Sequence, residues 1–258
     1  MLRVYHLFLL VVLLLLAPLG FKFVLPYFFP NKVEQKNSVT APTSKTSPLI
    51  SPGASSNSIE GNIWQKILGK NPIAPHGWQI APCQGNAPLL CVSSKGEVLG
   101  TVEIGVYQVS NNPNFQKDLQ EAGVPFGTQL DYKNPSNQTK VLSALKAWVA
   151  YYYTSLLKDR QKGYGNKISF STHPLEEVSV GKLPGVRYGF TGIKQEGGLQ
   201  EQYISHVAYD GKTLYVISTS FDPGAVTGKF EKLENLLIFQ PYYYAIAENL
   251  NLSVINGS

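Results

Sequence analysis

The stretch QYISHVAYDGKTLYVISTSF, residues 202–221, decides the fold class of this 258-residue chain. It contains two runs rich in β-branched and aromatic residues, and the pair Asp210-Gly211 between them is a strong signal for a tight hairpin turn. Two more strand-like runs precede it, so four strands are predicted in succession: 168–180, 185–193, 200–209 and 213–221. Consecutive strands with short links pair as an antiparallel meander.

Helices are predicted on both sides of this meander in the sequence. Between about Gln138 and Gln161 an apolar stripe recurs at helical spacing, and basic residues followed by Gly163 suit the end of a helix. A closing amphipathic helix is predicted from about 228 to 239. Its apolar residues are Phe230, Leu233, Leu236 and Leu237.

A hairpin over 78–92 and a long strand over 98–109 come before the long helix. The whole order predicts one α+β domain over residues 61–250, with a mostly antiparallel sheet covered by helices and a short tail over 251–258.

The N-terminal segment, residues 1–29, is predicted to be a single transmembrane helix. Every residue from Leu7 to Leu19 is apolar, and with its uncharged neighbours this run approaches the ~20 residues that span a bilayer. A cleaved signal peptide is the main alternative, although Ala17-Pro18-Leu19-Gly20 is a poor cleavage site; a buried helix is a third. Residues 30–60, rich in Pro, Ser, Thr and Asn, are predicted to be a flexible linker.

The net charge of +5 does not indicate nucleic-acid binding. The first 60 residues hold five basic and two acidic side chains, whereas the remaining 198 hold 17 basic and 15 acidic side chains. The predicted globular domain is therefore nearly neutral, which argues against a DNA- or RNA-binding surface.

Cys83 and Cys91 flank a turn-rich loop between two strand-like runs. Facing positions on a hairpin are close enough for a disulfide, so we expect this pair to be bonded; two reduced, buried thiols are the alternative. A disulfide would place the domain in an oxidising compartment. Charges flank the apolar segment on both sides, so the positive-inside rule does not decide its orientation.

The sequence offers no local motif for catalysis or cofactor binding. His76, His173 and His206 are far apart and lack the spacing of a metal site. The sequence contains no G-x-S-x-G, G-x-G-x-x-G or Walker pattern. We therefore predict no catalytic residue, no metal and no cofactor.

Two tyrosine triplets, at 151–153 and 242–244, are the unusual feature of the composition. Three successive residues on a helix sweep about 200°, so at least one ring of each triplet should face outward. Tyrosine is enriched at protein interfaces. Tyr151, Tyr153, Tyr242 and Tyr244 are thus a candidate partner surface, and packing of one or two rings into the core is the alternative.

Several of these segments together resemble the PsbP-like group, which shares an αβα sandwich with Mog1 and the DcrB-like lipoproteins. The resemblance rests on the hairpin through Tyr209-Asp210-Gly211-Lys212, on Gly77-Trp78, on Leu183-Pro184-Gly185 and on the helix after Phe221-Asp222, and it covers about 77–243. It implies a non-catalytic binding module on the outer side of a membrane, such as a photosystem accessory or assembly factor in a thylakoid lumen. The apolar anchor and the lack of a lipobox cysteine depart from that pattern, and no docking residue is carried over.

The predicted function is a membrane-anchored, extracytoplasmic, non-catalytic binding or assembly module in a periplasm or thylakoid lumen. Its expected contacts are membrane lipid, through the N-terminal segment, and a protein partner in a membrane complex. Two alternatives remain open. One is a small hydrolase or isomerase with a dispersed active site, and the other is a structural domain of an envelope complex.

Overall fold

The computed structural model describes residues 62–69, 72–125, 130–225 and 228–252. These residues belong to one compact unit, residues 42–258. The predicted anchor, the linker and most of the predicted tail lie outside the described residues. Within the described ranges, no helix combines the length and the apolar character that a membrane span requires.

The described residues form an eight-stranded sheet in the order β1-β2-β3-β8-β7-β6-β4, with β5 also paired to β6. All these strand pairings are antiparallel, which confirms the predicted sheet type. The strands are β1 Trp78–Pro82, β2 Leu89–Ser94, β3 Glu97–Gln108, β4 Ile168–Thr172, β5 Glu176–Val180, β6 Leu183–Lys194, β7 Leu199–Tyr209 and β8 Thr213–Phe221.

The segment 168–180 was predicted as one strand and is two. The backbone leaves the ladder after Thr172 and re-enters it at Glu176, so that β4 pairs with the end of β6 and β5 with its beginning. His173 lies in this break, where its N–H donates to the Gly189 carbonyl at 2.8 Å. The break therefore lets one edge of β6 pair with two successive short strands.

The helices are α2 Trp64–Ile67, α3 Pro113–Glu121, α4 Pro135–Tyr164 and α5 Leu233–Glu248, with short 3-10 turns at Val109–Asn111 and Gly165–Lys167. The long helix α4 begins with Pro135, and the Asn134 side chain caps it by accepting from the Ser136 N–H at 2.9 Å. Proline is suited to this first position because no N–H is needed there.

Helix α5 was predicted to end near residue 239 but continues through Pro241 to Glu248. A proline inside a helix removes the hydrogen bond to the residue four positions earlier, here Leu237. Pro241 and Leu237 are both exposed, so water can satisfy the free carbonyl. The helix therefore survives its internal proline.

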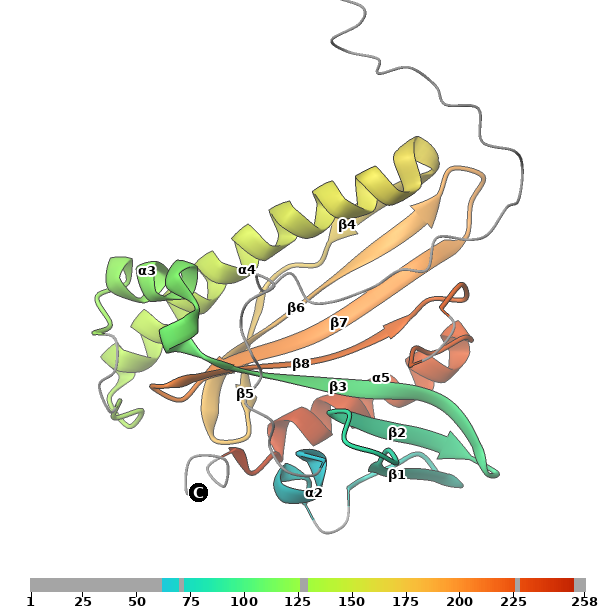
Figure 1. Cartoon of the computed structure of the whole chain (residues 1–258), viewed down its shortest axis with the longest axis horizontal. Coiled ribbons are helices and arrows are strands. Elements are labelled where there is room, and N and C mark those ends of the chain that lie inside the picture. The colour runs from blue at the N-terminus through green and yellow to red at the C-terminus, as the bar shows by residue number, and fades with distance from the viewer. Residues whose placement is uncertain (1–61, 70–71, 126–129, 226–227, 253–258) are drawn as a thin grey trace, which may run out of the picture. The chain divides into compact units, whose positions relative to one another are not determined.

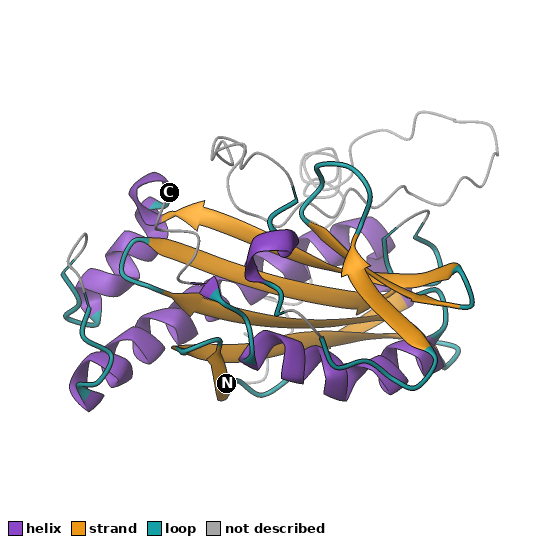
Figure 2. Ribbon diagram, turned by 90° about the horizontal axis from the view of Figure 1, so that it is seen from below, coloured by secondary structure: helices purple, strands orange, loops and turns teal. Residues whose placement is uncertain are grey.

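Helices cover both faces of the sheet, as Figures 1 and 2 show. On one face α3 and α4 bury a core that includes Phe115, Leu145, Trp148, Tyr188 and Val207. On the other face α2 and α5 bury a second core that includes Trp64, Ile104, Ile217, Phe239 and Tyr243. Because successive side chains of a strand point to opposite faces of the sheet, the strands contribute residues to both cores.

Candidate functional site

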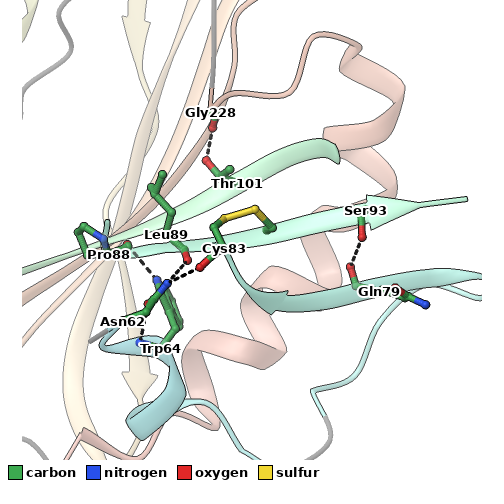
Figure 3. Close-up of a disulfide and its surroundings, with 10 residues drawn as sticks. Asn62, Trp64, Gln79, Cys83, Pro88, Leu89, Ser93, Thr101 and Gly228 are labelled. Carbon is green, nitrogen blue, oxygen red and sulfur yellow. Dashed lines mark hydrogen bonds between the residues drawn. A yellow bond between two sulfur atoms is a disulfide. The ribbon is translucent and has the colours of Figure 1, made fainter. Parts of the chain in front are cut away.

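The predicted disulfide is present: Cys83 and Cys91 are bonded, with their Cα atoms 5.0 Å apart. Cys83 follows β1 directly and Cys91 lies in β2, so the bond closes the loop between the two strands (Figure 3). Neither cysteine is fully buried. The bond lies at the edge of the sheet, because β1 is an outer strand.

The first tyrosine triplet lies on α4 and faces three ways. Tyr151 is 57% exposed, whereas Tyr152 is buried. Tyr153 is half-buried and its hydroxyl is tied to the backbone of Gly189, donating to the carbonyl at 2.8 Å and accepting from the N–H at 2.9 Å. Tyr151 is thus the ring of this triplet that is open to solvent.

The second triplet lies on α5, across the sheet from the first. Tyr243 is buried, and Tyr242 and Tyr244 are half-buried. The Arg187 guanidinium lies 4.0 Å from the centre of the Tyr244 ring, and Arg187 also pairs with Glu176 on β5. Because the triplets lie on opposite faces of the sheet, the four candidate tyrosines do not share one surface.

The outer side of α5 carries an apolar strip that the sequence did not reveal. Leu237 was counted among the apolar residues of this amphipathic helix, but Leu237 and Ile238 are each 50% exposed. The buried side consists of Leu236, Phe239, Tyr243, Ile246 and Ala247. Leu236 and Leu237 are 100° apart on a helix, so only one of the two can point squarely at the sheet.

A buried group of charged side chains lies where α4 ends, between α4, β7 and the segment after β8. Arg160 contacts Glu201 at 2.8 Å, and Lys229 contacts Asp222 at 3.2 Å and Glu201 at 3.8 Å. The Glu201 side chain is 1% exposed. One of its oxygens, Oε2, and the Nε of Arg160 have no hydrogen-bond partner among the described residues.

The surroundings of this charged group shift the pKa values of its carboxyl side chains. Burial raises the pKa of Glu201, and the nearby Arg160 and Lys229 charges oppose that rise. Burial also raises the pKa of Glu103 on β3, again against the charge of Lys229. Carboxyl groups with raised pKa values are typical of acid–base sites, although structural ion pairs show them too. Sequence reasoning missed the group because its members are far apart along the chain.

The three histidines of the domain lie in different settings. His76 is exposed just before β1, and His173 Nε2 lies 2.7 Å from the Thr191 hydroxyl. His206 is buried in β7, with Nδ1 3.1 Å from the Tyr243 hydroxyl. No set of three or more His, Cys, Asp or Glu side chains in the described part of the chain is arranged to hold a metal ion.

Comparison with known proteins gives only a distant likeness. No protein-family model matches the chain, and no curated protein sequence matches it. Among solved structures, the solution structure of cyanobacterial PsbP (CyanoP) from Synechocystis sp. PCC 6803 is similar over 69% of this chain and 83% of that chain, with 8% identity and a TM-score of 0.34. A likeness at this TM-score carries no argument about function.

Proposed function

We propose that this protein is a membrane-tethered, extracytoplasmic, non-catalytic binding or assembly module that docks a protein partner on the outer side of α5. The observation that carries the proposal is the pair Leu237 and Ile238, two adjacent aliphatic side chains that are each half exposed. Single exposed apolar residues are ordinary, but contiguous ones mark interaction surfaces.

The docking surface that we propose, called the α5 face, consists of Leu237, Ile238, Pro241 and Tyr244. Leu237, Pro241 and Tyr244 follow one another at helical spacing and so line one side of α5. Arg187 stacks on Tyr244 at the end of this line, and its partner Glu176 is 56% exposed. Tyrosine and arginine are both enriched at protein interfaces.

Two features support the proposed location. The disulfide between Cys83 and Cys91 fits an oxidising compartment such as a periplasm or thylakoid lumen. The apolar run from Leu7 to Leu19 fits a membrane tether. The more specific form of the proposal is an accessory factor of a photosynthetic membrane complex, as the PsbP-like sequence features imply. A structural domain of an envelope complex would use the same surface.

Replacing both Leu237 and Ile238 by aspartate is expected to reduce partner capture about 10- to 100-fold, which is the loss of one or two interface hot spots. The measurement is affinity purification from detergent-solubilised membranes, with quantification of each co-purified protein. Both side chains are half exposed, so the fold should tolerate the change.

Ile193→Asp is the matched control, because Ile193 is 46% exposed but lies in β6, away from α5. Tyr151→Ser tests the remaining exposed tyrosine on the opposite face. Equal capture by the α5 variant and the control would remove the α5 face from the proposal. Loss of capture only in Tyr151→Ser would move the docking surface to α4.

The charged group around Glu201 favours a second candidate, a small hydrolase or isomerase with a dispersed site. Its raised carboxyl pKa values and its unbonded Glu201 oxygen are the observations behind this alternative. If the intact protein captures no membrane partner at all, this alternative replaces the binding module.

A further inference from the structure

The loop closed by the disulfide, residues 83–91, holds the first described segment of the chain. The Asn62 side-chain amide donates to the carbonyl of Cys83 at 3.2 Å and to that of Leu89 at 3.0 Å. The Trp64 indole N–H donates to the carbonyl of Pro88 at 3.0 Å. Figure 3 shows these bonds converging on the loop beside the sulfur atoms.

The donor residues of these bonds are buried. Asn62 is 2% exposed and Trp64 is fully buried. The Asn62 amide contacts two carbonyls that lie six residues apart, so both bonds form only when the loop is folded back on itself. The N–H of Cys83 also donates to the Leu89 carbonyl at 3.0 Å. The geometry that receives Asn62 is therefore the geometry that the disulfide closes.

Helix α2 is too short to be stable by itself and depends on its contacts with the rest of the domain. It consists of only four residues, Trp64–Ile67, and a single turn is not stable in isolation. Besides the loop, it is held by the packing of Ile63, Trp64 and Ile67 and by one bond from the Asn251 N–H to the Ile67 carbonyl at 2.9 Å. Loosening the loop should therefore shift the opening equilibrium of α2 directly.

The disulfide closes a loop that lies at the surface. Cys83 and Cys91 are both partly exposed, and residues 84–88 between them are exposed. Exposed disulfides are the ones that exchange most readily with thiols. The bond lies on the edge hairpin, so its opening does not require the centre of the sheet to separate.

We propose that the Cys83–Cys91 disulfide is a redox latch that fastens the segment 62–69 to the domain and is opened by a dithiol reductant. A thiolate of the dithiol attacks one sulfur atom, forming a mixed disulfide and expelling the other cysteine as a thiolate. The second thiol of the reductant then displaces the first cysteine. The reductant becomes a disulfide, and the two cysteines take up two electrons and two protons.

Opening the latch would lengthen the connection between the domain and the membrane. This consequence rests on the proposed membrane anchoring. Residues 1–61 precede Asn62 in the chain. With the latch closed the segment 62–69 is held against the domain, and with the latch open the chain is released up to β1, which would add residues 62–77 to the predicted linker. Because mean reach grows with the square root of length, 16 more residues extend the predicted 31-residue linker by about 7 Å. Reduction would thus let the domain move farther from the membrane.

Hydrogen exchange of the full-length protein in detergent micelles tests the latch, oxidised and after treatment with dithiothreitol. The amides of Gln65, Lys66 and Leu68, which bond within the α2 turn, should exchange about 100-fold faster after reduction, the factor expected for opening a loop of this length. Amides of β6, β7 and β8 should keep their rates.

Two variants complete the test. Cys83→Ser/Cys91→Ser should show the fast rates without reductant, and Asn62→Ala should show them while the disulfide remains intact. Unchanged α2 rates after reduction would overturn the proposal. Equal acceleration in β7 and β8 would also overturn it, because the disulfide would then stabilise the whole domain. The assay contains no partner, so its outcome is independent of docking at the α5 face.

Discussion

Replacing Arg160 by methionine is expected to destabilise the domain by about 3 kcal/mol, the lower end of the range for breaking a buried ion pair. The change leaves the carboxylate of Glu201 almost fully buried, with Lys229 at 3.8 Å as its remaining cation. Removing one partner costs more than the pair contributes, because the other charge stays buried without compensation. Chemical denaturation at neutral pH measures the loss in the free energy of unfolding.

The double variant Arg160→Met/Glu201→Met separates this explanation from simple loss of packing. It removes both charges and keeps apolar volume on both sides, so it should recover most of the stability that Arg160→Met loses. If the double variant is less stable than the single one, the Arg160 stem, and not the stranded carboxylate, accounts for the loss.

Acidification is expected to destabilise the domain through His206. The Tyr243 hydroxyl donates to the Ile217 carbonyl at 2.7 Å, so the His206 Nδ1–H is the donor in the bond between His206 and Tyr243. Burial, reinforced by the positive charge of Arg187, lowers the pKa of His206 from 6.5 to about 3.

The sign of the effect follows from proton uptake. Between pH 6.5 and about 3 the unfolded chain binds a proton at His206 that the folded domain does not, so stability falls as pH falls through this window. The loss is about 1.4 kcal/mol per pH unit, or roughly 2 kcal/mol at pH 5. Above pH 6.5 His206 contributes no pH dependence.

His206→Gln is the comparison for this prediction, because glutamine cannot take up the proton. Unfolding free energies of both proteins are measured from pH 7 to pH 4.5, and the difference between the two curves isolates His206 from the other titrating groups. Parallel curves would contradict the prediction, because they would show that His206 has the same pKa in the folded domain as in the unfolded chain.

The features that depend on local sequence pattern were predicted correctly. The meander was correct at β6, β7 and β8 because Asp210-Gly211 and alternating side chains act over a few residues. The disulfide was correct for the same reason, since its two cysteines flank one turn. The long helix was placed correctly because its apolar stripe persists over several turns.

What the sequence did not predict depends on distant neighbours. Glu201 and Arg160 are 41 positions apart, and no local pattern links them; only the packing of α4 over β7 buries them together. The exposure of Leu237 was not predicted because the apolar residues of α5 cover most of its circumference, so their spacing alone does not tell which side meets the sheet. The strand break at His173 likewise depends on where β6 offers partners.

The position of β3 in the sheet sets the order in which the domain can assemble. Its partner is β8, and the Thr219 hydroxyl reaches the Thr101 carbonyl across 118 positions of sequence. During synthesis the β1–β3 hairpins leave the ribosome long before that partner exists, so one edge of β3 stays unpaired until nearly the whole domain has emerged. Contacts between residues so far apart in sequence form late, because closing the long loop between them costs conformational entropy. In pulse-labelled refolding we expect the β3 amides that face β8 to gain protection after those between β6 and β7; simultaneous protection would contradict this order.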